Sequence, residues 1–223
     1  MQEIQRTYLP AAGHDWALPL YDPLVKLLGA DGIRRTLLKQ ADLRPGHKVL
    51  DIGCGTGTLV ILIKGIHPDV SVVGIDPDPK ALARGKRKAE RAGVSVQFDQ
   101  GFSDELRYPD ASFDRVFSSF MFHHIYADQK EKTLREVWRV LSPQGSLHLL
   151  DFEPSEDGAH GVLGRLLSSS HRFKDNSEAS ILELMSVGGF ASPRKVAGGA
   201  MLFGHLRFAY YSGSRNDATV TSQ

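Results

Sequence analysis

The chain has 223 residues, of which 41% are hydrophobic, enough for one substantial core, and this argues against disorder over most of its length. Lysine and arginine total 27 against 26 acidic residues, and the resulting net charge of +1 argues against a dedicated polyanion binder. Cys54 is the only cysteine, which excludes an intramolecular disulfide and a cysteine-based zinc site.

The apolar runs, of which Leu59–Ile63 is among the longest, fall far short of the ~20 residues that span a bilayer. The first residues, MQEIQRTYLPAAG, lack the basic start and apolar stretch of a secretory signal. We therefore expect a cytoplasmic protein with no stable membrane insertion.

Short apolar stretches alternate with helical patterns along the chain, which is typical of an α/β domain whose parallel sheet is covered on both faces. The expected strands are 48–52, 71–75, 94–98, 115–118 and 146–150. The expected helices between them are 58–66, 79–92 and 128–141. Asp78 is placed to cap the second of these helices, with Pro79 at its first position.

The remaining segments divide one domain, 1–223, into further parts. We expect an N-terminal helical cap (1–45), a central core (46–152), a polar insert (153–176), a C-terminal helix and hairpin (177–211) and a flexible tail (212–223). The hairpin is predicted from two extended stretches, 193–197 and 206–211, separated by a glycine-containing turn. It should add one reversed strand at the edge of the sheet.

The strongest motif is VLDIGCGTGTL, residues 49–59, in which a strand meets a glycine-rich turn and then a helix. Its glycines, at 53, 55 and 57, allow close approach of a ligand to the backbone. The spacing departs from the dinucleotide fingerprint G-x-G-x-x-G, because position 58 is threonine, and no Gly-Lys-Ser/Thr of a Walker A loop is present. The negative charge of Asp51 would repel a phosphate ligand and attract a cationic amine.

A second acidic residue, Asp76, ends the second expected strand. A carboxylate at this place can accept both hydroxyls of a ribose, a need that nicotinamide and adenosyl ligands share. The helix-capping role belongs more naturally to Asp78, so we predict that Asp76 binds ribose.

At these residues the chain resembles the class I S-adenosylmethionine-dependent methyltransferases, and most closely the ubiquinone/menaquinone-biosynthesis C-methyltransferase-like group. VLDIGCGTGTL is similar to the family's first motif, GIDPD to its second, and GFSDELRYPDASFDRVFSS to the segment that follows. The resemblance implies a Rossmann-like, seven-stranded, mostly parallel, doubly wound sheet with one antiparallel edge strand. It also implies S-adenosyl-L-methionine as the cofactor and a small molecule as the methyl acceptor, with no metal.

The resemblance assigns roles around the cofactor. Asp51 and the turn from Gly53 through Cys54 to Gly55 would hold its amino-acid end. The ribose, the adenine and the reactive end would meet the following residues: Asp76, Pro77, Phe102, Ser103 and Ser118. Phe102 stands where the family usually has aspartate, so the adenine amino group would need Asp104 or Asp99, or Phe102 would stack on the ring.

His123 and His124 follow the fourth expected strand, on the side of the sheet where ligands bind, and are the candidate catalytic bases. The alternative is that one or both only pack or cap a helix. The candidate acceptor-binding residues are Tyr8, His14, Trp16, Tyr21 and Phe122.

We predict methyl transfer to a small molecule, without nucleic acid as a partner and with a homodimer left open. The alternatives are a non-catalytic regulator that binds an adenosyl ligand and, third, a nicotinamide-dependent oxidoreductase, against which Thr58 argues.

Overall fold

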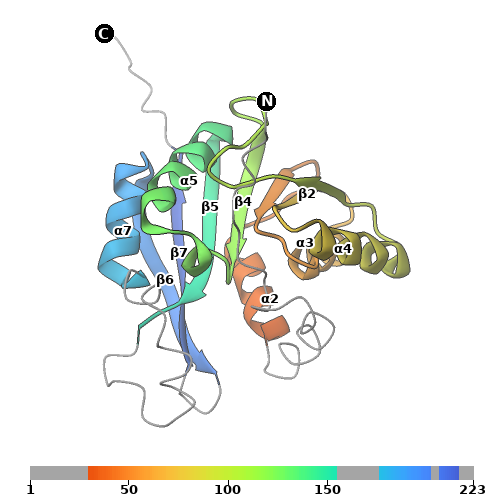
Figure 1. Cartoon of the computed structure of the whole chain (residues 1–223), viewed down its shortest axis with the longest axis horizontal. Coiled ribbons are helices and arrows are strands. Elements are labelled where there is room, and N and C mark those ends of the chain that lie inside the picture. Colours follow the sequence, from red (N-terminus) through yellow and green to blue (C-terminus); the bar gives the residue numbers. More distant parts are fainter. Residues whose placement is uncertain (1–29, 155–175, 202–205, 216–223) are drawn as a thin grey trace, which may run out of the picture.

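The computed structural model describes residues 30–154, 176–201 and 206–215 (Figure 1). One sheet of seven strands, in the order β3-β2-β1-β4-β5-β7-β6, forms its centre. The strands are β1 (Lys48–Ile52), β2 (Ser71–Asp76), β3 (Gln97–Gln100), β4 (Phe113–Ser119), β5 (Leu141–Phe152), β6 (Ala191–Met201) and β7 (Leu206–Ser214). The helices are α2 (Ala30–Gln40), α3 (Thr58–Ile66), α4 (Pro79–Ala92), α5 (Ala127–Val140) and α7 (Glu178–Val187), with a 3-10 turn at Phe122–His124.

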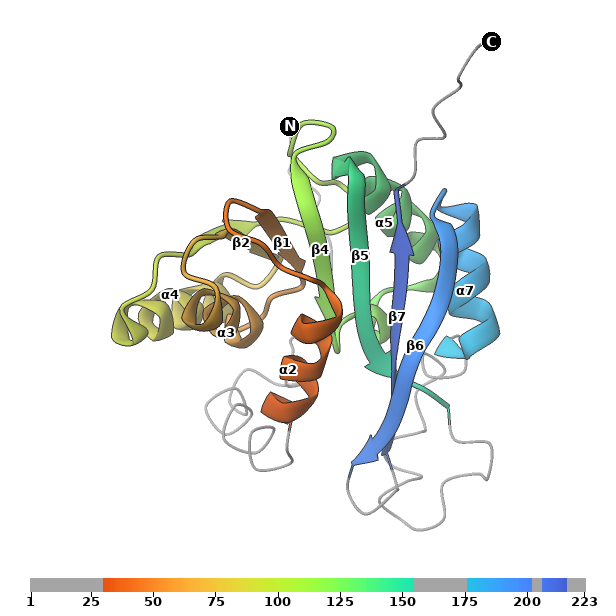
Figure 2. The ribbon, with the colours of Figure 1, turned by 180° about the vertical axis from the view of Figure 1, so that it is seen from behind.

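The first five strands pair in parallel, and β7 pairs antiparallel with both β5 and β6. The predicted mostly parallel, seven-stranded sheet with a C-terminal hairpin is thus confirmed. The reversed strand is β7, which lies between β5 and β6, so that the edge strand β6 runs in the same direction as the first five. Figure 2 shows β7 between its two neighbours.

Helices cover both faces of the sheet, as Figures 1 and 2 show from opposite sides. One face packs against α2, α3 and α4, with Leu37, Ile63 and Leu82 in a shared apolar cluster. The other face packs against α5 and α7, with Val137 and Ile181 in a second cluster. Strand residues alternate between the two clusters, because successive side chains of a strand point to opposite faces.

The predicted ends of helices and strands agree with the structure where a local sequence signal marks them. β1, α3 and α4 match their predicted ranges, and Asp78 caps α4 by accepting a hydrogen bond from the Lys80 amide at 2.8 Å. The third strand was predicted at 94–98 and is found at Gln97–Gln100. Its apolar residues Val94 and Val96 instead pack on the core from the connection after α4, and pairing with β2 begins only at Gln97.

Two other predicted segments differ from the structure or lie outside it. β7 continues to Ser214, so the first residues of the expected tail at 212–223 belong to a strand. Residues 1–29 of the expected cap and 155–175 of the expected insert are outside the described residues. In the described ranges, every helix is too short or too polar to cross a bilayer.

Candidate functional site

A pocket opens where β1, β2 and β4 end, the edge at which parallel α/β sheets bind ligands. Its wall comes from the loops after these strands, the segment after β3, and α5. The lining residues are Gly53, Gly55, Asp76, Pro77, Gly101, Phe102, Ser103, Asp104, Phe120, Met121, His124, Ile125, Tyr126, Gln129 and Thr133. Six of the nine predicted cofactor residues are among them; Asp51, Cys54 and Ser118 are not.

The glycines of the turn after β1 do different things, although all three have positive φ. A Cβ at Gly53 would overlap the Met121 side chain, and one at Gly57 would come within 2.8 Å of the Phe98 ring. A Cβ at Gly55 would meet nothing within 4 Å. Gly57 therefore serves internal packing, Gly53 leaves room for Met121 in the pocket wall, and Gly55 leaves the backbone open to the pocket.

Asp51 sits near the end of β1 and is only 2% exposed. Its Oδ1 has no hydrogen-bond partner among the described residues. Burial raises the pKa of Asp51 to about 8; the positive charge of Arg34 opposes this rise and the charge of Asp76 adds to it. A buried carboxylate with an unused acceptor is costly unless a donor or a cation satisfies it.

Asp76 ends β2 and ties the glycine turn to that strand. Its Oδ2 accepts from the Gly55 amide at 2.8 Å and its Oδ1 accepts from the Asp78 amide at 2.9 Å. Burial raises the pKa of Asp76 to about 6, although these two N–H donors favour the charged form. A carboxylate offers about four lone-pair positions, so about two remain for hydroxyls in the pocket.

The segment after β3 brings Phe102, Ser103 and Asp104 to the pocket wall. Asp99 is not part of that wall. Its Oδ2 accepts from the Tyr108 hydroxyl and from Gln97 Nε2, both at 2.8 Å. Of the two carboxylates that could replace the usual aspartate, the structure thus brings only Asp104 to the pocket.

The chain turns sharply where β4 ends. Phe120 has φ of 55°, a conformation that is uncommon for a bulky residue, and its ring stacks on Phe152 at 4.6 Å. Its amide also donates to the Leu150 carbonyl at 2.8 Å. This fixed, strained turn points the chain so that Met121 and His124 line the pocket.

The two histidines occupy different environments. His123 is 7% exposed, and its Nδ1 lies 2.5 Å from Oδ1 of the fully buried Asp151, whose Oδ2 accepts from the His123 amide. Burial works to raise the pKa of Asp151, but the imidazole and the N–H donors outweigh it and hold the pKa below its ordinary value. His124 packs on the His123 ring at 4.1 Å between centroids and lines the pocket.

The structure places the other predicted residues away from the pocket or outside the described ranges. Phe122, a predicted acceptor-binding residue, is fully buried in the cluster beneath α5 and does not line the pocket, so the structure places it in the core. The Cys54 side chain packs against Gly74 of β2, and burial raises the pKa of its thiol. The remaining acceptor-binding candidates, all from the N-terminal segment, lie outside the described residues: Tyr8, His14, Trp16 and Tyr21.

A family model described as a methyltransferase domain matches residues 49–145. The chain is 40% identical over 151 residues to the demethylmenaquinone methyltransferases of Deinococcus radiodurans and Thermus thermophilus. Both alignments cover 66% of this chain, and they span 62% and 68% of those two proteins. The chain belongs to the S-adenosylmethionine-dependent methyltransferase family.

The fold agrees with this family. The crystal structure of YcgJ from Bacillus subtilis aligns with a TM-score of 0.67 at 22% identity, covering 82% of this chain and 98% of that one. At 22% identity this similarity shows the fold alone. The fold is the Rossmann-like methyltransferase architecture predicted from the sequence.

The residues of this methyltransferase fit a cofactor with an amino-acid end and a nucleoside end. Asp51 carries the unused acceptor that an ammonium group would satisfy, and Gly55 leaves the backbone open beside it. Asp76 retains acceptor capacity for ribose hydroxyls. Ser118, fully buried in β4, has a hydroxyl oxygen with no partner among the described residues. No group of three acidic, histidine or cysteine residues in those ranges is arranged to hold a metal ion.

Helix α5 also lines the pocket, a contribution that was not predicted from the sequence. Gln129 and Thr133 line it from the first turns of that helix, after Ile125 and Tyr126 at its start. Their spacing of four residues places them on one face of the helix. Polar residues at this spacing, directly after the loop that follows β4, were the available signal.

Proposed function

We propose that this chain transfers a methyl group from S-adenosyl-L-methionine to a small-molecule acceptor and releases S-adenosylhomocysteine. The carrying observation is Asp51, a buried carboxylate with an unused oxygen, beside a turn whose Gly55 is open to the pocket. An acid in this position disfavours a phosphate and favours an ammonium group. This is what separates a methionine-containing ligand from a dinucleotide.

In the proposed reaction each part of the pocket has one task. Asp51 and the Gly53–Gly55 turn hold the amino-acid end, and Asp76 accepts the ribose hydroxyls. Asp104 accepts from the adenine amino group and Phe102 contacts the ring. The sulfonium of the bound cofactor supplies an activated methyl group, so the protein needs chiefly to align the acceptor and to exclude water.

We infer that the acceptor is a small aromatic ring of the quinol type. The part of the pocket beyond the nucleoside-binding residues is apolar and aromatic, with Phe120, Met121, Ile125 and Tyr126 in its wall. Two similar proteins are named for demethylmenaquinone, which supports the same class of acceptor. A quinol ring becomes a good carbon nucleophile when a hydroxyl loses its proton.

We propose His124 as the group that takes this proton. It lines the pocket, whereas His123 lies behind it and is fixed by Asp151. Imidazole is the side chain that most often acts as a general base. General-base catalysis of this kind contributes about 10²–10⁴-fold.

Calorimetry with S-adenosylmethionine, S-adenosylhomocysteine and NAD tests the proposal first. We expect the adenosyl ligands to bind in the micromolar range, about −8 kcal/mol, and NAD far more weakly. The second step is to measure S-adenosylhomocysteine release with a short-chain demethylmenaquinol, and with a catechol, an amine and a thiol as comparison acceptors. Tighter binding of NAD would indicate an oxidoreductase. Tight cofactor binding with no turnover on any acceptor would indicate a regulator.

A further inference from the structure

The wall of the pocket after β3 is attached to α5 along much of its length. Near the pocket, the hydroxyls of Ser103 and Thr133 lie 3.1 Å apart. Further along, the Leu106 amide donates to Glu136 Oε2 at 2.8 Å. The Ala111 amide donates to the Arg139 carbonyl at 3.0 Å. The segment from Ser103 to Ala111 therefore follows the helix.

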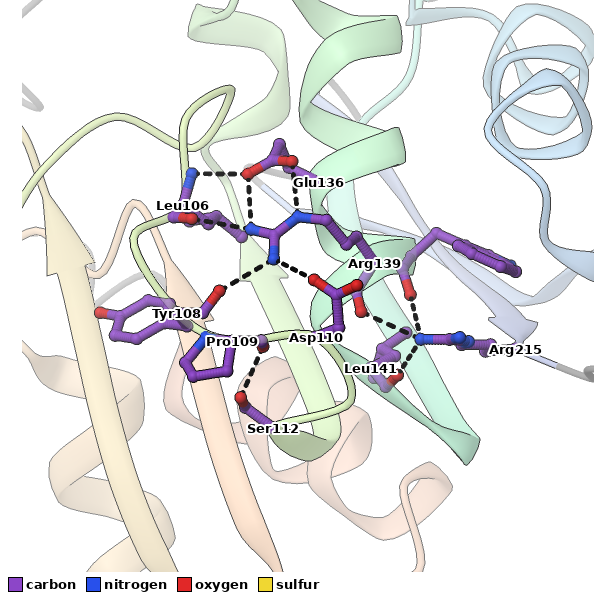
Figure 3. A network of polar contacts seen from close by, with 10 residues as sticks. Leu106, Tyr108, Pro109, Asp110, Ser112, Glu136, Arg139, Leu141 and Arg215 are labelled. Carbon is purple, nitrogen blue, oxygen red and sulfur yellow. Dashed lines mark hydrogen bonds and ion pairs between the residues drawn. The ribbon is translucent and has the colours of Figure 1, made fainter.

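Arg139 is the centre of this attachment (Figure 3). Its Nη2 donates to the Leu106 carbonyl at 2.8 Å, and its Nη1 donates to the Tyr108 carbonyl at 2.9 Å and to Asp110 Oδ1 at 2.6 Å. Its Nε and Nη2 also bind the two oxygens of Glu136, at 2.8 and 2.9 Å. One planar guanidinium thus holds three positions of the loop and one of the helix, which a lysine cannot reproduce.

Neither Arg139 nor Glu136 lines the pocket, but they share a helix with residues that do. Thr133 is six residues before Arg139, which is about 9 Å along the helix axis. The loop that Arg139 holds begins with Phe102, Ser103 and Asp104, which line the same pocket next to Thr133. The position of these loop residues in the pocket wall therefore depends on the attachment of the loop to α5.

We infer that Arg139, with Glu136, is a positioning residue for the nucleoside end of the pocket and sets the affinity and selectivity for the adenine ring. Without the guanidinium, the loop occupies other positions, and the ligand must order it on binding. That ordering weakens the measured affinity in proportion to the fraction of molecules whose loop is already in place. The inference rests on the proposed cofactor.

The test compares Arg139→Gln and Arg139→Lys with a control on the same helix. Arg135→Gln is that control, because Arg135 is 63% exposed and pairs with Glu131, away from the loop. Calorimetry would use S-adenosylhomocysteine and its inosine analogue, which lacks the adenine amino group. We expect Arg139→Gln to weaken S-adenosylhomocysteine binding at least ~10-fold and to narrow its preference over the inosine analogue. The affinity of Arg139→Lys should lie between those of Arg139→Gln and the wild type, and the affinity of Arg135→Gln should equal that of the wild type.

The outcomes separate this inference from the proposed function. A wild-type protein that does not bind S-adenosylhomocysteine would overturn both. An unchanged dissociation constant in Arg139→Gln would overturn the positioning role alone. A smaller fraction of binding-competent protein, with an unchanged dissociation constant, would also overturn it. If Arg139→Gln fails to fold, Glu136→Ala removes the acceptor of the Leu106 amide while leaving Arg139 in place. It should weaken binding in the same direction, and unaltered binding in that variant would overturn the inference.

Discussion

Two buried carboxylates near the carboxyl ends of strands differ in the hydrogen-bond partners that the protein supplies to them. Asp51, in β1, is 2% exposed, and Asp151, in β5, is fully buried. Asp151 accepts from the His123 amide, its imidazole and the Phe152 amide, and its pKa is held low. Asp51 has an oxygen with no partner in the described residues, and its pKa is raised to about 8 by burial.

The difference separates an internal structural pair from a site that is completed by a ligand. The fold satisfies Asp151 with its own donors, so the pair has no need of a partner from outside. The fold leaves Asp51 costly in the free protein. A carboxylate that destabilises the free chain and stabilises the complex favours ligand binding. Substitutions at Asp51 and at Asp151 test this comparison.

The largest effect is expected from Asp151→Asn, which leaves the His123 site without its charge partner. Breaking a buried pair by changing one member costs about 3–5 kcal/mol. Urea unfolding at pH 7 should show this loss, and His123→Gln should show a similar one. Asp128→Asn, at an exposed position in the first turn of α5, is the control and should change little. A loss under about 1 kcal/mol in Asp151→Asn would mean that the pair is not structural.

The next effect concerns turnover. His124→Gln should lower turnover with a quinol at least ~100-fold and remove the limb of the pH–rate profile that depends on the base, because the base is gone. Cofactor affinity should stay within a few fold. Two histidine variants, at 123 and 124, with near-wild-type turnover and unchanged pH profiles would place both residues among the packing residues.

A smaller effect is expected at the other carboxylate. Asp51→Asn should weaken binding of S-adenosylmethionine at least ~10-fold, which is about 1.4 kcal/mol. It should also raise the free energy of unfolding of the free protein at pH 8, since the amide carries no charge into the buried site. The two measurements should move in opposite directions; a variant that is both less stable and unaltered in affinity would end the comparison.

The smallest expected effect is the release of a proton when the cofactor binds. Asp51 has a folded pKa of about 8, above the ~3.9 of an unfolded aspartate, so the folded chain binds more protons between these values. Its contribution to stability therefore falls as pH rises from about 4 to 8, whereas the contribution of Asp151 is lost as pH falls below about 4. Cofactor binding at pH 7 should release up to about one proton. Calorimetry in buffers of different ionisation enthalpy measures it, with Asp51→Asn as the control.

Local signals in the sequence were sufficient for much of the fold. The glycine turn fixed the junction of β1 and α3, and Asp78 with Pro79 fixed the start of α4. The third strand was placed too early because Val94 and Val96 have a strand-like alternation, which in the fold serves packing beside α4.

The parts of the site that were missed depend on contacts distant in sequence. Asp151 meets His123 across 28 residues, and no local pattern distinguishes it from other strand residues. Phe122 and His124 are two residues apart, yet one is in the core and the other in the pocket. Their places follow from the strained turn at Phe120, which the side-chain pattern does not reveal.

Arg215 links the far end of the chain to the pocket helix. Its Nη1 donates to the carbonyls of Arg139 and Leu141, at 2.9 and 2.7 Å, where α5 ends and helical carbonyls lack internal partners (Figure 3). During synthesis on the ribosome, β1 to β5 emerge well before this residue and before β7, which inserts beside β5. The end of α5 therefore lacks the hydrogen bonds from Arg215 in the nascent chain until β7 has emerged.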